Sequence, residues 1–68
     1  MLLSIVVPVY NEEENIANFY KAVTDVMSGL TYDYELIFVD DGSSDSSAMI
    51  LREIAFNDKH VKVLLLDS

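Results

Sequence analysis

Two adjacent carboxylates, Asp40 and Asp41, are the residues whose type and position most clearly suggest chemistry. They directly follow the apolar run 36–39, and a glycine, two serines and a third carboxylate, Asp45, come next. A buried parallel strand that ends in this way presents acidic groups at the carboxyl edge of its sheet, where open α/β sheets bind ligands. Carboxylates there can accept hydrogen bonds from a base or sugar, or hold a divalent cation, but they repel a bare phosphate.

A second polar segment, residues 8–14, follows the apolar run at the start of the chain. The ring of Tyr10 could stack on a nucleotide base, and Asp41 could accept a hydrogen bond from a ring N–H of that base. Glu12, or the backbone near Pro8, could reach the ribose or the base edge. Because neighbouring parallel strands end at the same edge of a sheet, we expect these residues to converge on one crevice.

The usual phosphate-binding loops are missing from both segments. No G-x-G-x-x-G follows the first strand and no G-x-x-x-x-G-K-[ST] occurs, so the usual dinucleotide-binding site and the P-loop are excluded. We expect Glu12, Glu13 and Glu14 to occupy the first turn of a helix, where they suit the helix dipole but repel a pyrophosphate. A nucleotide bound here would place its phosphates elsewhere, with a divalent cation.

Strands are predicted over 2–7, 35–39 and 61–66, because these runs are short, apolar and rich in β-branched residues. Helical patterns separate them, which gives the order β-α-β-α-β. This alternation predicts an α/β fold in which a three-stranded parallel sheet has right-handed crossovers. With the strand order 3-2-1, both helices lie on the same face of the sheet.

The helix boundaries are predicted from capping residues. Asn11 is a good N-cap with Glu14 as its capping-box partner, and Ser43 or Ser44 can cap the second helix. The first helix is expected to run for about four or five turns before Ser28 breaks it. Its apolar stripe consists of Ile16, Phe19, Tyr20, Val23, Met27 and Leu30.

The strands are apolar on both faces, but the chain has too few helices to cover both. The most apolar strand, 2–7, is also left at an open edge of the sheet. We therefore interpret residues 1–68 as the opening, N-terminal half of a larger fold. In isolation, the chain is expected to self-associate, forming a dimer or larger homo-oligomer.

Composition excludes several functional classes. The 68 residues include 4 Lys and Arg against 12 Asp and Glu, a formal net charge of −8, so binding to nucleic acid is not expected. The chain has no cysteine and one histidine, His60, which excludes a zinc centre built from several such ligands. The apolar start lacks the basic leader of a signal peptide and is far shorter than a membrane span.

The two polar segments together resemble a known family. Residues 5–13, Ile-Val-Val-Pro-Val-Tyr-Asn-Glu-Glu, followed at this distance by residues 39–45, Val-Asp-Asp-Gly-Ser-Ser-Asp, look like the start of a family-2 glycosyltransferase of the GT-A fold. The likeness is closer to the polyprenyl-phosphate sugar transferases, the dolichol-phosphate mannose synthase and bactoprenol glucosyltransferase group. It covers essentially the whole chain and implies a Rossmann-like nucleotide-binding half-domain.

The resemblance implies roles for individual residues. Positions matching Pro8, Tyr10 and Glu12 line the nucleotide base and ribose, the position matching Asp41 hydrogen-bonds the base, and Asp40 supports the same pocket. The family's metal-binding D-x-D and its catalytic base lie further along the chain, and Asp67-Ser68 does not match the D-x-D. The divalent cation, magnesium or manganese, would thus be held in the parent enzyme by residues outside this chain.

The resemblance implies a parent enzyme that transfers a sugar from a nucleotide-diphosphate sugar to a polyprenyl phosphate or another acceptor. That enzyme would be cytoplasmic, or at the cytoplasmic face of a membrane, and this chain alone would be inactive. Receiver domains also carry acidic strand ends, but their acidic pair follows the first strand, which here ends in Pro8-Val9-Tyr10. A non-catalytic α/β interaction module that self-associates through its uncovered sheet face is the remaining alternative.

Overall fold

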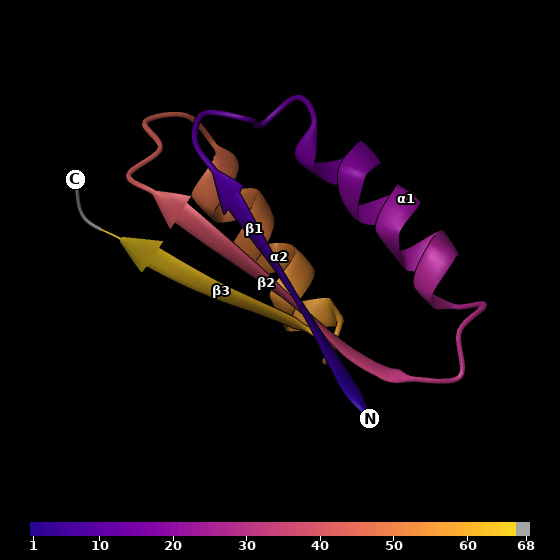
Figure 1. The fold of residues 1–68 in the computed structure, drawn as a ribbon. Coiled ribbons are helices and arrows are strands. Elements are labelled where there is room, and N and C mark those ends of the chain that lie inside the picture. The colour runs from indigo at the N-terminus through magenta and orange to yellow at the C-terminus, as the bar shows by residue number, and fades with distance from the viewer. Residues whose placement is uncertain (67–68) are drawn as a thin grey trace.

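The computed structural model describes residues 1–66, so the expectation for Asp67-Ser68 lies outside the described residues. Strands and helices alternate along the chain, which confirms the predicted order β-α-β-α-β (Figure 1). The elements are β1 Leu2–Val9, α1 Ile16–Met27, β2 Asp33–Asp41, α2 Ser47–Asn57 and β3 Val61–Leu66. Neither helix in this range has the length and apolar character needed to cross a membrane.

The strands form one parallel sheet in the order β1-β2-β3, as predicted, with β2 at its centre. The ladder between β1 and β2 ends with the pair Val9 and Asp40. The ladder between β2 and β3 ends with the pair Asp41 and Leu66. The carboxyl ends of all the strands therefore meet at one edge of the sheet, and the acidic residues lie there (Figure 1).

The hydrophobic core lies on the side of the sheet that the helices cover. Leu36 and Phe38 of β2 meet Leu51 of α2 there, and none of these side chains is more than 1% exposed. Phe19 reaches the same core from α1, with its ring edge-on to Phe38 and the ring centroids 6.3 Å apart. Both helices therefore pack on one face, as right-handed crossovers require for this strand order.

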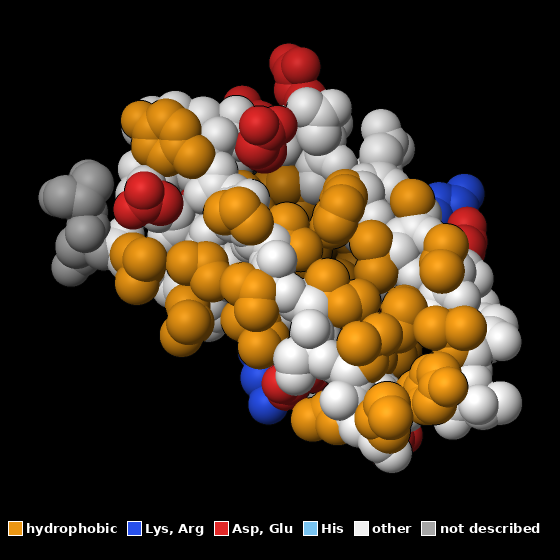
Figure 2. Space-filling view, viewed as in Figure 1, with side chains coloured by type: hydrophobic (Ala, Val, Ile, Leu, Met, Phe, Trp, Pro, Cys, Tyr) orange, Lys and Arg blue, Asp and Glu red, His pale blue; other side chains and the backbone are white. Residues whose placement is uncertain are grey.

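The other side of the sheet is apolar and uncovered within residues 1–66, as predicted. Val6 is 62% and Leu64 is 54% exposed, and Figure 2 shows apolar side chains gathered across the strands. We call this surface the open face; successive strand residues alternate between it and the core. Its apolar members are Leu2, Val6, Pro8, Ile37, Val39, Leu64 and Leu66.

One polar row crosses the open face. The Ser4 hydroxyl donates to Glu35 Oε1 at 2.6 Å, and Lys62 Nζ donates to Glu35 Oε2 at 2.9 Å. These hydrogen bonds, that from Ser4 first, hold the pKa of the Glu35 carboxyl below its usual range. The row joins β1, β2 and β3 and separates Leu2 from the larger apolar area beyond it.

The strands extend further than the apolar runs predicted. β1 continues through Pro8 to Val9, and β2 extends beyond both ends of the predicted run 35–39. Pro8 is tolerated because β1 is an edge strand, where a missing N–H need not interrupt the ladder. The extra residues of β2 are paired with β1, with β3 or with both, so the sheet rather than local hydrophobicity sets its length.

The predicted start of the first helix was wrong. α1 begins at Ile16 and has 12 residues, its N-cap residue is Asn15, and no side chain caps it. Asn11 therefore does not cap the helix, Glu14 is not its capping-box partner, and residues 12–14 lie before the first turn. The physical reason is tertiary, because Asn11 forms hydrogen bonds with the loop after β2 instead.

The predicted cap of the second helix was also wrong. The N-cap residue of α2 is Ser46, which makes no side-chain capping bond. Ser43 and Ser44 instead make hydrogen bonds to Asn11. In both loops, contacts between the loops occupy the residues that were predicted as caps, while Asp45 Oδ1 accepts the N–H of Ser47 at the start of α2.

Candidate functional site

Tyr10 and Asp41 lie side by side where β1 and β2 end. Val9 and Asp40 form the last pair of the ladder, so the next residues along the two strands are Tyr10 and Asp41. Both are exposed, and neither side chain takes part in a hydrogen bond among residues 1–66. An aromatic ring and a carboxyl group are thus both available to a ligand at this edge.

Asp40 has a different environment from its neighbour. It is 3% exposed and lies on the core side of β2, because successive strand residues face opposite sides. Its Oδ1 accepts a hydrogen bond from the Ser43 hydroxyl, which ties the end of β2 to the loop that follows. Of the two adjacent carboxylates, only Asp41 therefore faces solvent.

The chain turns in the same way after each of these strands. Asn11 has a φ of 49° and Gly42 a φ of 74°, so both adopt the left-handed region directly after Tyr10 and Asp41. Glycine adopts this region freely, and asparagine does so more readily than most other residues. The two loops therefore leave the sheet with matching bends and can lie against each other.

The first loop, residues 10–15, and the second loop, residues 42–46, are joined by reciprocal hydrogen bonds. We call this set of hydrogen bonds the loop clasp. Backbone N–H groups of Asn11, Glu12 and Glu13 donate to side chains of the second loop or of Ser47, the first residue of α2, at 2.9, 3.0 and 3.2 Å. Those of Ser44 and Ser46 donate to side chains of the first loop at 2.8 and 3.0 Å. The side-chain acceptors are Ser43, Ser47, Asp45, Asn11 and Glu13.

One hydrogen bond of the clasp, that between Glu12 and Ser47, is partly buried. Ser47 is fully buried, and its hydroxyl accepts the N–H of Glu12. Asp45 accepts the N–H of Ser47 at 2.9 Å, and hydrogen bonding from Ser47 holds the pKa of the Asp45 carboxyl below its usual range. Sequence reasoning missed the clasp, because serine and aspartate near a helix start signal a cap equally well.

Pro8 and Glu12 line a cavity between the end of β1 and the start of α1. Its volume is about 180 Å³, and its other lining residues are Val7, Val9, Asn15, Ile16, Phe19 and Phe38. The Glu12 carboxylate accepts a hydrogen bond from Asn15 Nδ2 at 3.1 Å. The predicted site residues thus lie near the ends of β1 and β2, but Pro8 and Glu12 border this cavity, while Tyr10 and Asp41 stand at the strand ends.

The acidic residues near this corner do not form a cation site among the described residues. No group of three or more metal-ligating side chains gathers anywhere within residues 1–66. Asp40 and Asp45 direct their oxygens at Ser43, Glu13 and Ser47 instead. The divalent cation implied by the sequence resemblance therefore does not fit the described residues.

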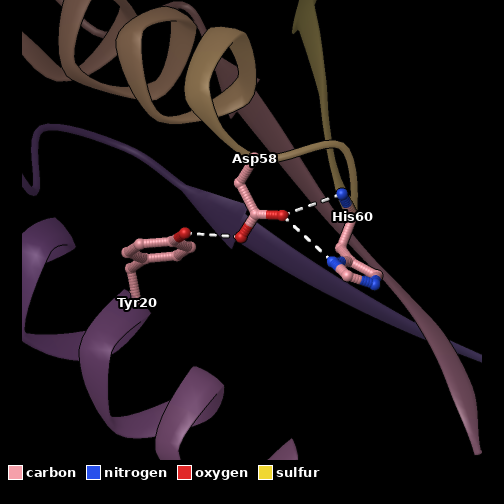
Figure 3. A network of polar contacts seen from close by, with 3 residues as sticks. All are labelled: Tyr20, Asp58 and His60. Atoms are coloured by element: carbon pink, nitrogen blue, oxygen red, sulfur yellow. Dashed lines mark hydrogen bonds and ion pairs between the residues drawn. The ribbon is translucent and has the colours of Figure 1, made fainter. Parts of the chain in front are cut away.

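A separate polar network lies at the opposite edge of the sheet (Figure 3). The Tyr20 hydroxyl donates to Asp58 Oδ2 at 2.5 Å, and Asp58 Oδ1 accepts the backbone N–H of His60 at 2.9 Å. His60 Nδ1 lies 3.1 Å from the same oxygen, and the His60 ring stacks on Tyr34 with the centroids 4.3 Å apart. The network joins α1 to the start of β3 far from Tyr10 and Asp41, which indicates a structural role.

Both loops lie within the part of the chain that matches known proteins. A family model for glycosyl transferase family 2 matches residues 4–68. An undecaprenyl-phosphate 4-deoxy-4-formamido-L-arabinose transferase of Proteus mirabilis is 46% identical over 66 residues, which cover 96% of this chain and 20% of that protein. A prophage bactoprenol glucosyl transferase homolog of Escherichia coli is 43% identical over 58 residues, 85% of this chain and 19% of its own length.

A third relative is similar over nearly the same range. It is an uncharacterized glycosyltransferase of Bacillus subtilis, 51% identical over 61 residues, which cover 90% of this chain and 19% of that protein. The chain therefore spans about a fifth of the length of the curated relatives it matches.

Proposed function

This chain belongs to glycosyl transferase family 2, and from that premise we propose that residues 1–68 form the N-terminal, nucleotide-recognising half of a sugar-donor site. The parent enzyme would transfer a sugar from a nucleotide-diphosphate sugar to an acceptor, and the names of the relatives favour a polyprenyl phosphate. Such an acceptor would place the transfer at a membrane surface, and we propose the cytoplasmic face. The 68-residue chain would be inactive by itself, because it spans about a fifth of those relatives.

The observation that carries this proposal is the exposed pair at the strand ends. Tyr10 offers a ring for stacking on the base, and Asp41 offers a carboxylate that can accept the base's ring N–H. Pro8 and Glu12 supply the ribose side of the corner, while Asp40 supports the turn through Ser43. The proposal assigns no catalytic residue and no metal ligand to residues 1–66; the divalent cation belongs to the rest of the parent enzyme.

Replacing Asp41 by asparagine is expected to weaken nucleoside binding about tenfold, because a charge-assisted hydrogen bond becomes a neutral one. Uridine and guanosine are suitable probes, since they carry no phosphate and respond little to the change in net charge. Dissociation constants from NMR titration, on the order of millimolar for the wild type, provide the measurement.

Asp33→Asn is the matched control, because Asp33 is an exposed carboxylate at the opposite end of the same strand. Its nucleoside affinity should equal that of the wild type. Equal losses in both variants, or no loss with Asp41→Asn, would argue that the carboxylate at the end of β2 does not read the base.

The open face favours a second candidate, a non-catalytic module that pairs with another copy of itself. Sedimentation should then show a dimer or larger species at high concentration. Leu64→Glu should give a monomer, because it places a charge within the apolar area of the open face. Met49→Glu, at a 70% exposed position on α2, is the control that should leave association unchanged. A wild-type chain that stays monomeric would contradict this candidate.

A further inference from the structure

Asn11 holds a central place in the loop clasp. It lies directly after Tyr10, adopts the left-handed backbone region, and is bonded to the second loop through both its backbone and its side chain. Its N–H donates to the Ser43 hydroxyl at 2.9 Å, while its Oδ1 accepts the N–H of Ser44 at 2.8 Å and lies 3.4 Å from the Ser44 hydroxyl. No hydrogen bond among residues 1–66 uses Asn11 Nδ2.

These contacts connect the two residues that carry the proposed base recognition. Asn11 is the neighbour of Tyr10, and Ser43 and Ser44 follow Asp41 after one glycine. The Ser43 hydroxyl also donates to the buried Asp40, so the chain of bonds runs from Asn11 to the end of β2. The first loop is exposed and the second is only partly buried, so without the clasp they would have to be ordered when a ligand binds.

We infer that Asn11 is a positioning residue for the donor nucleotide, which it orders through Tyr10 and Asp41 without contacting it. This inference rests on the proposed function. The side-chain carbonyl of Asn11 fixes the bend after Tyr10 against the bend after Asp41. The distance between the Tyr10 ring and the Asp41 carboxylate is therefore set before the base binds. Such preorganisation lowers the ordering cost of binding.

The core does not depend on this contact. Leu36, Phe38 and Leu51 are buried against one another away from the loops, so loss of the Asn11 side chain should leave the fold intact. A merely structural role would change stability, whereas a positioning role changes nucleoside affinity at constant core protection.

Two substitutions at position 11 separate the acceptor from the backbone shape. Asn11→Gly retains access to the left-handed region but removes Oδ1, and Asn11→Asp retains an oxygen where Oδ1 lies. With uridine and guanosine as probes, Asn11→Gly is expected to weaken binding about tenfold, and Asn11→Asp to stay within about twofold of the wild type.

Amide hydrogen exchange, measured on the same samples, reports the two regions separately. In Asn11→Gly the Ser44 amide should lose protection, while the Phe38 and Leu51 amides keep theirs. Glu13→Ala is a second variant at an exposed position, which removes the acceptor of the Ser46 N–H. It should weaken nucleoside binding about threefold and keeps the test available if Asn11→Gly does not fold.

The outcomes distinguish this inference from the proposed function. If the wild type binds nucleosides at Tyr10 and Asp41, but Asn11→Gly with an unprotected Ser44 amide binds equally well, the inference is overturned and the proposed function stands. If the wild type binds neither nucleoside at that corner, the proposed function fails and the inference fails with it. A loss with Asn11→Gly that Asn11→Asp restores, at constant core protection, supports both.

Discussion

Replacing Phe38 by alanine is expected to leave most of the chain unfolded in the absence of denaturant. Phe38 is 1% exposed at the centre of the sheet, where its ring also meets the edge of Phe19. Truncating a buried phenylalanine costs about 3–5 kcal/mol. A single core in a chain of this length supplies roughly that amount in total, so little or no net stability should remain.

Circular dichroism with a urea titration measures this effect. Phe56→Ala is the matched control, because it removes the same side chain from a position on α2 that is 90% exposed. The control should unfold cooperatively at the wild-type midpoint. A Phe38→Ala chain that did the same would show that the core is not where the structure places it.

Replacing Tyr20 by phenylalanine is expected to lower the free energy of unfolding at neutral pH by about 1.5–3 kcal/mol. This is the usual range for a hydrogen bond to a charged group, and Tyr20 donates to Asp58 at 2.5 Å. The substitution also removes the donor to Oδ2 of the half-buried Asp58, while the backbone N–H of His60 still donates to Oδ1. α1 should then be held less firmly to the start of β3.

The same contact predicts how stability depends on pH. The hydrogen bond to Asp58 raises the pKa of Tyr20 from 10.0 to about 12, so its contribution is present below pH 10 and is lost as the pH rises through 12. Burial acts to raise the pKa of Asp58, but hydrogen bonds from Tyr20 and His60 outweigh it and lower that pKa below 3.8. The Asp58 contribution is therefore present above pH 3.8 and is lost as the pH falls below it.

Urea titrations between pH 7 and pH 12 check this prediction. The difference in stability between the wild type and Tyr20→Phe should shrink above pH 10. Tyr32→Phe, at a 51% exposed position, should behave like the wild type throughout. A gap that stayed constant up to pH 12 would show that the Tyr20 hydroxyl does not donate to Asp58 in solution.

The sheet could be predicted from the sequence because its signals are local and consistent. Each strand is a short apolar run, the helical segments between them require parallel pairing, and right-handed crossovers then place both helices on one face. The alternating burial of β2 also separates Asp40 from Asp41. Period-two alternation along the strand already contained that distinction.

The loops could not be predicted, because their hydrogen bonds join residues far apart in the chain. Asn11 and Ser44 are both of residue types that favour the N-cap of a helix, so local propensity predicts that role. In the folded chain the neighbouring loop offers the same groups better partners, so the tertiary contacts prevail. Tyr20 and Asp58 likewise lie on separate elements, and no local pattern connects them.

Chemical-shift mapping of the isotope-labelled chain with uridine and guanosine tests whether the ends of β1 and β2 form a base-recognition corner. We expect the largest changes at the amides of Tyr10 and Asp41, smaller ones at Glu12, and none at Tyr20 or Asp58. Changes confined to the cavity residues Ile16 and Phe19 and their neighbours, or no changes up to the solubility limit of either nucleoside, would contradict it.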